Sequence, residues 1–351
     1  MMTTFLQRLG LMIPIIQAPM AGASNAGFVV AACQAGIIGS LGAGMMKPEQ
    51  INDEINAIKA LVQGCFAVNL MILPKRLTDR VIEPMPAWLV QCYKSINQPA
   101  DIEMPPAPDF AEQLAVLLDN PVPVASFTFG ILQASQVDAL HAVGTQVIGT
   151  ANHPDEVLAW IEAGADAVVL QGAEAGGHRG GWLYEQSKPL MLDELWAATK
   201  QALATADKSI PLIVAGGIAT RQQVQKYLSM GAEAVSVGTA FLTTHEAVIH
   251  KAYQARLLSA KACDTALTRL YSGKLARGII TEYMRQFAQF DGLQRHAQIP
   301  EYPMLNAMTK KLRAVSTQMH NTEMMSLWAG MGVEHCRDET ISQLVARLGC
   351  D

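Results

Sequence analysis

Short apolar runs recur along the chain, and each follows an amphipathic stretch that ends in a glycine. The clearest of these glycines are Gly36, Gly144, Gly164 and Gly231. A glycine after a helix readily takes the left-handed conformation that ends it. The runs are too short for helices, and they do not alternate apolar and polar residues, as expected of strands covered on both faces. The pattern therefore predicts a repeated unit of helix, turn and buried strand.

Eight such runs can be counted. The predicted strands are residues 13–18, 37–40, 66–70, 122–127, 146–150, 167–171, 212–215 and 234–238. Helical patterns lie between them, for example at residues 48–62, 154–163, 221–230 and 245–259. This order predicts an α/β protein of the (β/α)8 TIM barrel class. The alternative is an open doubly wound sheet, but such a sheet usually carries GxGxxG after its first strand, where this chain has APMAG.

Two segments fall outside the repeat. Residues of about 74–120, which include a proline-rich stretch at 97–108, are predicted to be an insertion after the third strand that packs over the top of the barrel. Residues 264–351 are predicted to form a mostly helical C-terminal extension. The sequence thus predicts a barrel at residues 1–263 with an extension at 264–351 in contact with it.

Composition narrows the possible functions. Half the residues are hydrophobic and 16% are charged, as expected of a large buried core. The net charge of −5 and the lack of clustered Lys and Arg argue against a nucleic-acid partner. No apolar run approaches the ~18 residues of a membrane span. The six cysteines form no CxxC pair, which disfavours a metal site and a disulfide scaffold and indicates the cytoplasm. A small-molecule substrate is the expectation.

Loops after the strands carry the candidate binding groups, because barrel active sites lie at the carboxyl ends of the strands. Residues 215–218 and 237–240 follow the seventh and eighth strands, and Thr220 begins a helix, as in many barrel phosphate sites. Small residues there let backbone N–H groups approach a phosphate. Asn69 and Gln171 could hydrogen-bond a ring system such as an isoalloxazine, or they could satisfy loop backbone.

His178 is the candidate catalytic residue. It follows the sixth strand in the loop EAGGHRGG at residues 174–181, where glycines offer no hydrophobic burial that would explain a histidine. An imidazole can take a proton or stabilise an anion near neutral pH. Glu174 could orient His178 or cap a turn, and Arg179 is expected to face water. The chain has no GxSxG, HExxH or GxxxxGK[ST] pattern, which argues against common hydrolase, zinc protease and P-loop functions.

Taken in order, these segments resemble the nitronate monooxygenase family, and the resemblance spans nearly the whole chain. The matching segments are residues 14–22, 126–130, 171–180, 215–218, 237–241, 272–278 and 326–330, with Asn69 after the third strand. The resemblance implies a tightly bound FMN. It also implies oxidation of alkyl nitronates, such as propionate 3-nitronate, by O2 to a carbonyl compound and nitrite.

The resemblance also assigns roles to single positions. The residues implied to hold FMN are Asn69, Gln171, Gly176, Gly216, Gly217, Ser236, Val237, Gly238 and Thr239, with Met20 and Gly22 against the ring. His178 is implied to be the active-site histidine, which either hydrogen-bonds the nitro group or removes the α-proton of a neutral nitroalkane. Tyr302 is implied to line the substrate pocket. Relatives often have a histidine at Thr128 and Arg-Pro at 274–275, so substrate range is the property in question.

Two rival functions stay open. An FMN-dependent enoyl-acyl-carrier-protein reductase shares the EAGGH loop and the glycine pair, but it would need NAD(P)H, and the segment at 326–330 favours the monooxygenase. A flavin-binding protein without turnover is disfavoured by the presence of both His178 and the phosphate loops. The sequence leaves the oligomeric state undetermined, and a homo-oligomer is compatible with it.

Overall fold

Eight parallel strands form one sheet, as the sequence pattern predicts. The computed structural model describes residues 5–73, 84–101 and 108–349. The strands of the sheet are β1 (Ile15–Gln17), β2 (Gly39–Gly42), β3 (Phe66–Met71), β4 (Val124–Thr128), β5 (Gln146–Ala151), β6 (Ala167–Gln171), β8 (Leu212–Ala215) and β9 (Ala234–Val237). Each overlaps one of the predicted runs. Their order is β1-β9-β8-β6-β5-β4-β3-β2.

The sheet closes on itself between β1 and β2. Ile16 and Ile38 form a parallel bridge, and the Gln17 backbone N–H donates to the Ile38 carbonyl at 2.8 Å. The two ends of the strand order are therefore neighbours, and the sheet is a barrel rather than an open doubly wound layer. The TIM barrel prediction is confirmed.

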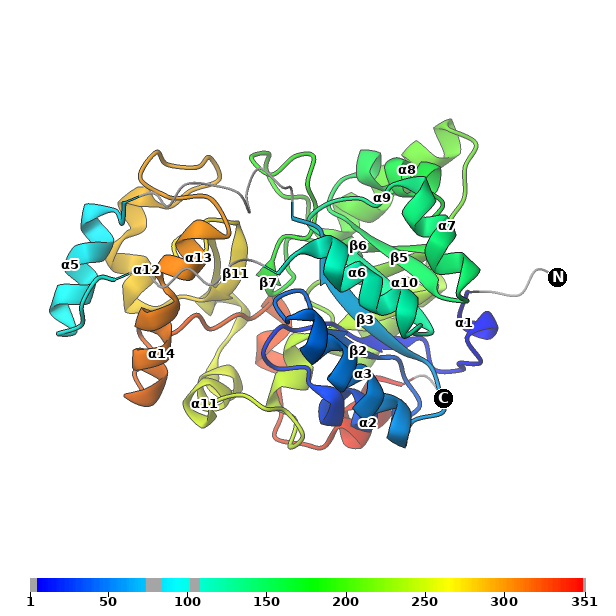
Figure 1. Cartoon of the computed structure of the whole chain (residues 1–351), viewed down its shortest axis with the longest axis horizontal. Helices are drawn as coiled ribbons and strands as arrows, with labels where there is room; N and C mark the ends of the chain where they lie inside the picture. Colours follow the sequence, from blue (N-terminus) through cyan, green and yellow to red (C-terminus); the bar gives the residue numbers. More distant parts are fainter. Residues whose placement is uncertain (1–4, 74–83, 102–107, 350–351) are drawn as a thin grey trace.

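Helices cover the outside of the barrel (Figure 1). They are α2 (Ala26–Gln34), α3 (Pro48–Leu61), α6 (Phe110–Asp119), α7 (Ala134–Ala142), α8 (Pro154–Ala163), α9 (Leu192–Thr205), α10 (Arg221–Ser229) and α15 (Ile341–Leu348). Two of these helices, α6 and α15, lie outside the segments that the sequence pattern assigns to the barrel repeat. α6 lies within the segment assigned to the insertion, yet it packs against α3 and β3 as a barrel helix.

The last helix, α15, lies in the segment predicted to be an extension in contact with the barrel, and it packs on the barrel between α10 and α2. Its apolar side chains Ile341, Leu344 and Leu348 are fully buried in the same core cluster as the strands. The chain therefore leaves the barrel after β9, builds the extension, and returns to complete the ring of helices. A sequence pattern read in linear order does not show such a return.

The extension forms a second layer beside the barrel, on the left of Figure 1. It contains α11 (Lys251–Ser259), β10 (Thr265–Thr268), β11 (Ala276–Ile279), α12 (Glu282–Gln286), α13 (Met304–Met308) and α14 (Lys310–Gln318). Helix α5 (Ala87–Ser95), from the predicted insertion, joins this layer. Trp88 and Tyr93 of α5 share an apolar cluster with Tyr271 and Tyr283. Two segments nearly 200 residues apart therefore form one small core.

The opposite end of the barrel is closed by the chain's start. Phe5 and Leu6 of α1 (Phe5–Arg8) are buried against Ile16, Ile38 and other residues at the amino ends of the strands. Because this end is closed, the open face of the barrel is the one that carries the loops after the strands.

In the part of the chain that the structure describes, no helix combines the length and apolar character needed to cross a membrane.

If α15 completes the barrel, truncating its central leucine should destabilise the whole protein. We expect Leu344→Ala to lower the free energy of unfolding by about 2–4 kcal/mol, because it leaves a cavity between α15 and the barrel. Urea unfolding followed by circular dichroism measures this. Leu258→Ala on α11, where the leucine is 41% exposed, is the matched control and should change stability little. Equal effects of the two substitutions would contradict the placement of α15.

Candidate active site

A short strand in the glycine-rich loop holds His178 in place. Gly177–His178 forms β7, which pairs in antiparallel register with β11, so that His178 lies opposite Ala276 and Gly177 opposite Arg277. The Arg277 side chain adds a hydrogen bond from Nε to the Ala173 carbonyl at 2.8 Å. The backbone of the candidate catalytic residue is thus fixed by the extension and not only by the barrel.

Close contact between glycines locks this loop against the segment at residues 326–330. A Cβ on Gly176 would lie 2.5 Å from the Gly330 nitrogen, and one on Gly330 would lie 2.6 Å from the Glu174 carbonyl oxygen. The Gly330 N–H donates to Thr239 Oγ1 at 2.9 Å, which ties the same segment to the loop after β9. Only glycine permits this spacing. The two sequence segments that resemble the family are therefore in direct contact.

Aromatic rings surround the His178 imidazole on several sides. The ring centroids of Phe129, Tyr302 and Trp328 lie 5.9, 5.6 and 5.3 Å from it. These three rings come from the loop after β4, from the residues just before α13 and from the segment at 326–330. Tyr302 thus lies beside His178, and its role at a substrate pocket stays a prediction.

Ser272 contacts the imidazole directly, with 2.8 Å between its Oγ and His178 Nε2. The same Oγ lies 3.1 Å from the Lys274 carbonyl oxygen, to which it can donate its single proton. When it does, His178 Nε2 must carry the proton of the imidazole and donate to Ser272. When the hydroxyl turns to Nε2 instead, the imidazole proton lies on Nδ1. Ser272 therefore permits either neutral tautomer of His178.

The surroundings of His178 favour the uncharged imidazole. Burial, together with the positive charges of Lys274 and Arg313, lowers the pKa of His178 to about 3. The imidazole is therefore neutral at pH 7 and acts as a hydrogen-bond partner or a weak base. This corrects the expectation of an imidazole that titrates near neutral pH.

The two cations near His178 are held differently. Lys274 is buried, forms an ion pair with Glu185 and lies 4.6 Å from the centroid of the Phe129 ring. Burial lowers the pKa of Lys274, and the carboxylate of Glu185 opposes that effect. Arg313, on α14, donates from Nη2 to the backbone and side-chain oxygens of Asn306, at 2.8 and 2.9 Å. A positive field therefore acts on the site.

Backbone amides after β8 and β9 form a cradle suited to a phosphate. Gly216 and Gly217 have φ of 123° and 69°, in the region that favours glycine. Within the described chain, the N–H groups of Gly217, Ile218 and Gly238 have no recorded hydrogen-bond acceptor. Free N–H groups beside the start of a helix attract anions. The fit to the phosphate of a flavin nucleotide rests on these unpaired donors.

Asn69 and Gln171, the two side chains predicted to hydrogen-bond the flavin ring, differ in whether they keep a free hydrogen-bonding atom. Asn69 is buried and donates to the Ser126 hydroxyl and carbonyl oxygens, at 3.0 and 3.2 Å, which leaves its own Oδ1 for another partner. Gln171 donates to the His178 carbonyl at 3.0 Å and accepts from the Gly180 N–H at 2.7 Å. Gln171 therefore supports the backbone of its own loop, the second of the two roles open to it.

The other candidates lie near the same rim. Met20 approaches the position of a Cβ on Gly238 with its sulfur at 3.8 Å, and Gly22 is exposed with a φ of 81°. Ser236 and Val237 are buried at the end of β9. Thr128 donates to the Gly180 carbonyl at 3.1 Å, so that it braces the histidine loop. The structure thus gathers the predicted residues around the carboxyl ends of the strands.

Two expectations about the neighbours of His178 are resolved. Glu174 accepts from the Leu192 N–H at 2.9 and 3.0 Å, so it caps the start of α9 and does not orient the imidazole. Arg179, expected to face water, is only 7% exposed and donates to the Gly172 carbonyl. The expectation was wrong because the extension covers this loop.

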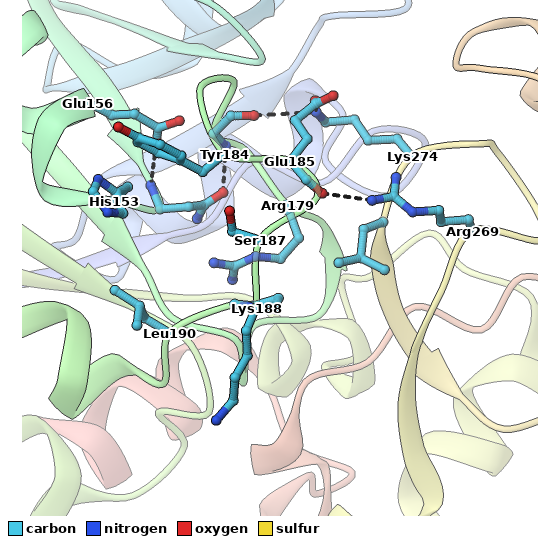
Figure 2. Close-up of a pocket in the computed structure, with 14 residues that line it drawn as sticks. His153, Glu156, Arg179, Tyr184, Glu185, Ser187, Lys188, Leu190, Arg269 and Lys274 are labelled. Atoms are coloured by element: carbon cyan, nitrogen blue, oxygen red, sulfur yellow. Dashed lines mark hydrogen bonds and ion pairs between the residues drawn. The ribbon is translucent and has the colours of Figure 1, made fainter. Parts of the chain in front are cut away.

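A small pocket lies beside the site, on the outer side of the histidine loop. Figure 2 shows Arg179, Glu185, Arg269 and Lys274 around it. Its volume of about 50 Å³ can hold a few water molecules but not a flavin. The pocket shows where the Lys274–Glu185 pair reaches the surface, and it is separate from the phosphate cradle.

Several site residues were not selected from the sequence. Met45 and Met71 contact the Tyr302 hydroxyl with their sulfur atoms, at 3.2 and 3.7 Å. The others are Phe129, Ser272, Arg313 and Trp328. Phe129, Ser272 and Trp328 lie within segments that resemble the family, so a signal existed for them. Arg313 had none, because one arginine in an amphipathic helix is indistinguishable from a surface residue until the helix is placed.

The lowered pKa of His178 predicts an effect on stability. The unfolded chain binds a proton on this imidazole below about pH 6.5 and the folded chain only below about pH 3, so stability is lost as pH falls through that range. The loss should reach about 2 kcal/mol by pH 5. Between pH 7 and pH 5, the free energy of unfolding of His178→Asn, measured in urea, should fall by about 2 kcal/mol less than that of the wild type. His320→Asn, at an exposed position, is the control; identical pH dependence in all three proteins would count against the neutral imidazole.

Comparisons with known proteins identify the family of this chain. A family model described as nitronate monooxygenase matches residues 3–351. A probable nitronate monooxygenase from Staphylococcus aureus strain Newman is 33% identical over 348 residues, covering 97% of this chain and 96% of the relative. One from strain JH9 is 34% identical over 352 residues, with the same coverage.

Solved structures show the same fold. A nitroalkane oxidase from Streptomyces ansochromogenes superposes with a TM-score of 0.84 at 31% identity, covering 98% of this chain and 96% of that one. FabK from Thermotoga maritima has a TM-score of 0.74 at 22% identity, covering 99% and 95%, which shows the fold alone. The family model and the relatives cover almost the whole chain. The chain belongs to the nitronate monooxygenase family of flavin-dependent oxidoreductases.

Proposed function

We propose that this protein is an FMN-dependent nitronate monooxygenase that works in the cytoplasm. Two alkyl nitronate anions and one O2 give two carbonyl compounds and two nitrite ions, which balances atoms and charge. The observation that carries the proposal is a neutral imidazole inside an aromatic enclosure with a positive field, on the rim that holds the phosphate cradle. Family membership supports the reaction class.

The residues of this chain can hold FMN at both ends. The N–H groups of Gly217, Ile218 and Gly238 would bind the phosphate, and Asn69 Oδ1 would accept from the ring system. Met20 and Gly176 lie on the rim between these groups. FMN, when bound, would take electrons from the nitronate and pass them to O2. The protein supplies position, charge and exclusion of water.

His178 would contact the nitro group of the substrate. An anionic nitro group beside the ring favours the tautomer with the proton on Nδ1, because that atom can then donate to oxygen. The Ser272 hydroxyl would turn to Nε2 in that state and leave the Lys274 carbonyl. The cost is one weak hydrogen bond, exchanged for a charge-assisted one.

The low pKa of His178 also affects which form of the substrate can react, the neutral nitroalkane or its nitronate anion. A neutral nitroalkane must lose its α-proton before oxidation, and a base with a pKa of about 3 removes a proton from carbon poorly. A nitronate has already lost that proton. The site therefore favours nitronates over the corresponding nitroalkanes.

The phosphate cradle can be tested by flavin content. Gly217→Ala should abolish or strongly reduce bound FMN, because a Cβ would lie 3.0 Å from Glu174 Cβ and the φ of 69° is strained for alanine. The measurement is the ratio of flavin to protein absorbance, with the flavin released by heat and identified by chromatography. Gly144→Ala carries the same backbone strain at φ 83° with open space around it, and should keep its FMN. Full FMN content in Gly217→Ala would refute the cradle.

The reaction can be tested by anaerobic titration. Propionate 3-nitronate and propyl nitronate should bleach the flavin, and NADPH should not. In air, kcat/KM for propyl nitronate should exceed that for neutral 1-nitropropane by about 100-fold or more, because of the missing base. Bleaching by NADPH without bleaching by nitronates would support an enoyl reductase instead. A flavin that no reductant bleaches would support a binding protein without turnover.

A further inference from the structure

Phe129 has a backbone conformation that is unusual for a buried aromatic residue. Its φ is 72°, in the left-handed region, and the residue is only 7% exposed. Among the described residues, the other non-glycine positions with positive φ are Asn97, Asp207 and His320, which are all exposed. Asn, Asp and His tolerate this region, whereas a bulky side chain adopts it only under strain. The contacts of the Phe129 side chain must therefore offset a cost that a glycine would not incur.

The strained turn ties the loop after β4 to the histidine loop. The Phe129 N–H donates to the Gly180 carbonyl oxygen at 2.7 Å, and Thr128 Oγ1 donates to the same oxygen at 3.1 Å. Gly180 lies two residues after His178. The backbone at Phe129 is therefore fixed to the segment that carries the imidazole.

The Lys274 ammonium has more donors than the oxygen atoms around it accept. An ammonium group carries three N–H donors. Lys274 Nζ donates to Glu185 (Figure 2) and to the Gly181 carbonyl oxygen at 3.3 Å. No third acceptor is recorded for it in the described chain, but Nζ lies over the Phe129 ring, 4.6 Å from the ring centroid. The face of an aromatic ring attracts a cation most strongly where water is excluded, and Lys274 is buried.

The same ring contacts the imidazole. Phe129 and His178 pack edge to face, with their centroids 5.9 Å apart and an interplanar angle of 80°. Tyr302 packs on Phe129 in the same way, at 5.6 Å and 73°. The charge of Lys274 also acts on His178. One phenyl ring is therefore in contact with both the cation and the imidazole of the candidate site.

Accepting the proposed function, we propose that Phe129 is a positioning residue of the active site. Its left-handed backbone fixes the ring against His178, and the π face of the ring holds the Lys274 ammonium beside the imidazole. Without the ring, the ammonium would follow Glu185, whose side chain is 47% exposed, toward the surface. With the ring, its charge keeps a fixed place relative to the nitro group at His178.

Fluorination of the Phe129 ring tests this role in the full-length, FMN-bound enzyme. Replacement by mono-, di- and trifluorophenylalanine withdraws charge from the ring face in steps, while the ring stays apolar and nearly the same size. We expect kcat/KM for propyl nitronate to fall with each fluorine, by about tenfold in the trifluoro form. Packing alone predicts no such series, because fluorine makes the ring slightly larger and more apolar. Phe129→Leu, which has no π face, should lose about as much as the trifluoro form.

Two controls separate the contact with the cation from other effects of the substitution. In a Lys274→Met background the ammonium is absent, so the same fluorinated rings should leave kcat/KM at the value of that background. Phe127 lies two residues earlier on β4, is buried, and packs against Phe110 at 6.3 Å. Fluorination of Phe127 should leave kcat/KM within about twofold of the wild type.

Thermal unfolding gives a readout that needs no turnover. The trifluoro form of Phe129 should lower the unfolding midpoint by about 2–3 °C, and this shift should disappear in the Lys274→Met background. A flat kcat/KM series at Phe129, or the same series in Lys274→Met or at Phe127, would overturn the assignment. An unchanged midpoint would overturn it as well. Failure of the proposed function looks different, because the wild-type enzyme would then turn over no nitronate while the midpoints still report on the ring and the ammonium.

Discussion

Two backbone pairings at Gly177 and His178 determine how this site is built. A loop of glycines has no side chains to fix its path, so its conformation must come from a partner. Strand β11 supplies that partner, and the contact between Gly176 and Gly330 prevents the loop from moving outward. The extension therefore contributes to the candidate active site, because its strand β11 pairs with the backbone that carries the imidazole.

This dependence explains why the chain returns to the barrel at its end. The extension is inserted between β9 and α15, so both of its ends are anchored in the barrel core. Two anchors restrict its motion more than a terminal attachment would. Helix α5 adds a third connection through Trp88 and Tyr93, which pack against the extension. A site shared between two layers needs this rigidity, since small displacements weaken catalysis strongly.

The sequence predicted what local pattern controls and missed what long-range packing controls. The eight strands and the glycine turns are local features, and all eight strands were found. The role of α15 could not be predicted, because an amphipathic helix fits a barrel and an extension equally well. Glu174, Gln171 and Arg179 show the same limit at the site. Each has a polar side chain in or beside the glycine-rich loop, but only the fold shows that it satisfies backbone groups. His178 could be recognised because the glycines beside it offer no hydrophobic burial that would explain a histidine at that position.

The two departures from the family pattern act on charge in different ways. Lys274 keeps the positive charge of an arginine, but it is paired with Glu185, so that its field at the imidazole is partly cancelled. Thr128 replaces a titratable ring with a hydroxyl that is already used by Gly180. Both changes leave less charge beside the His178 imidazole than the family pattern would supply. Lys274 belongs to the extension and Thr128 to the barrel, so both layers contribute to the surroundings of the imidazole.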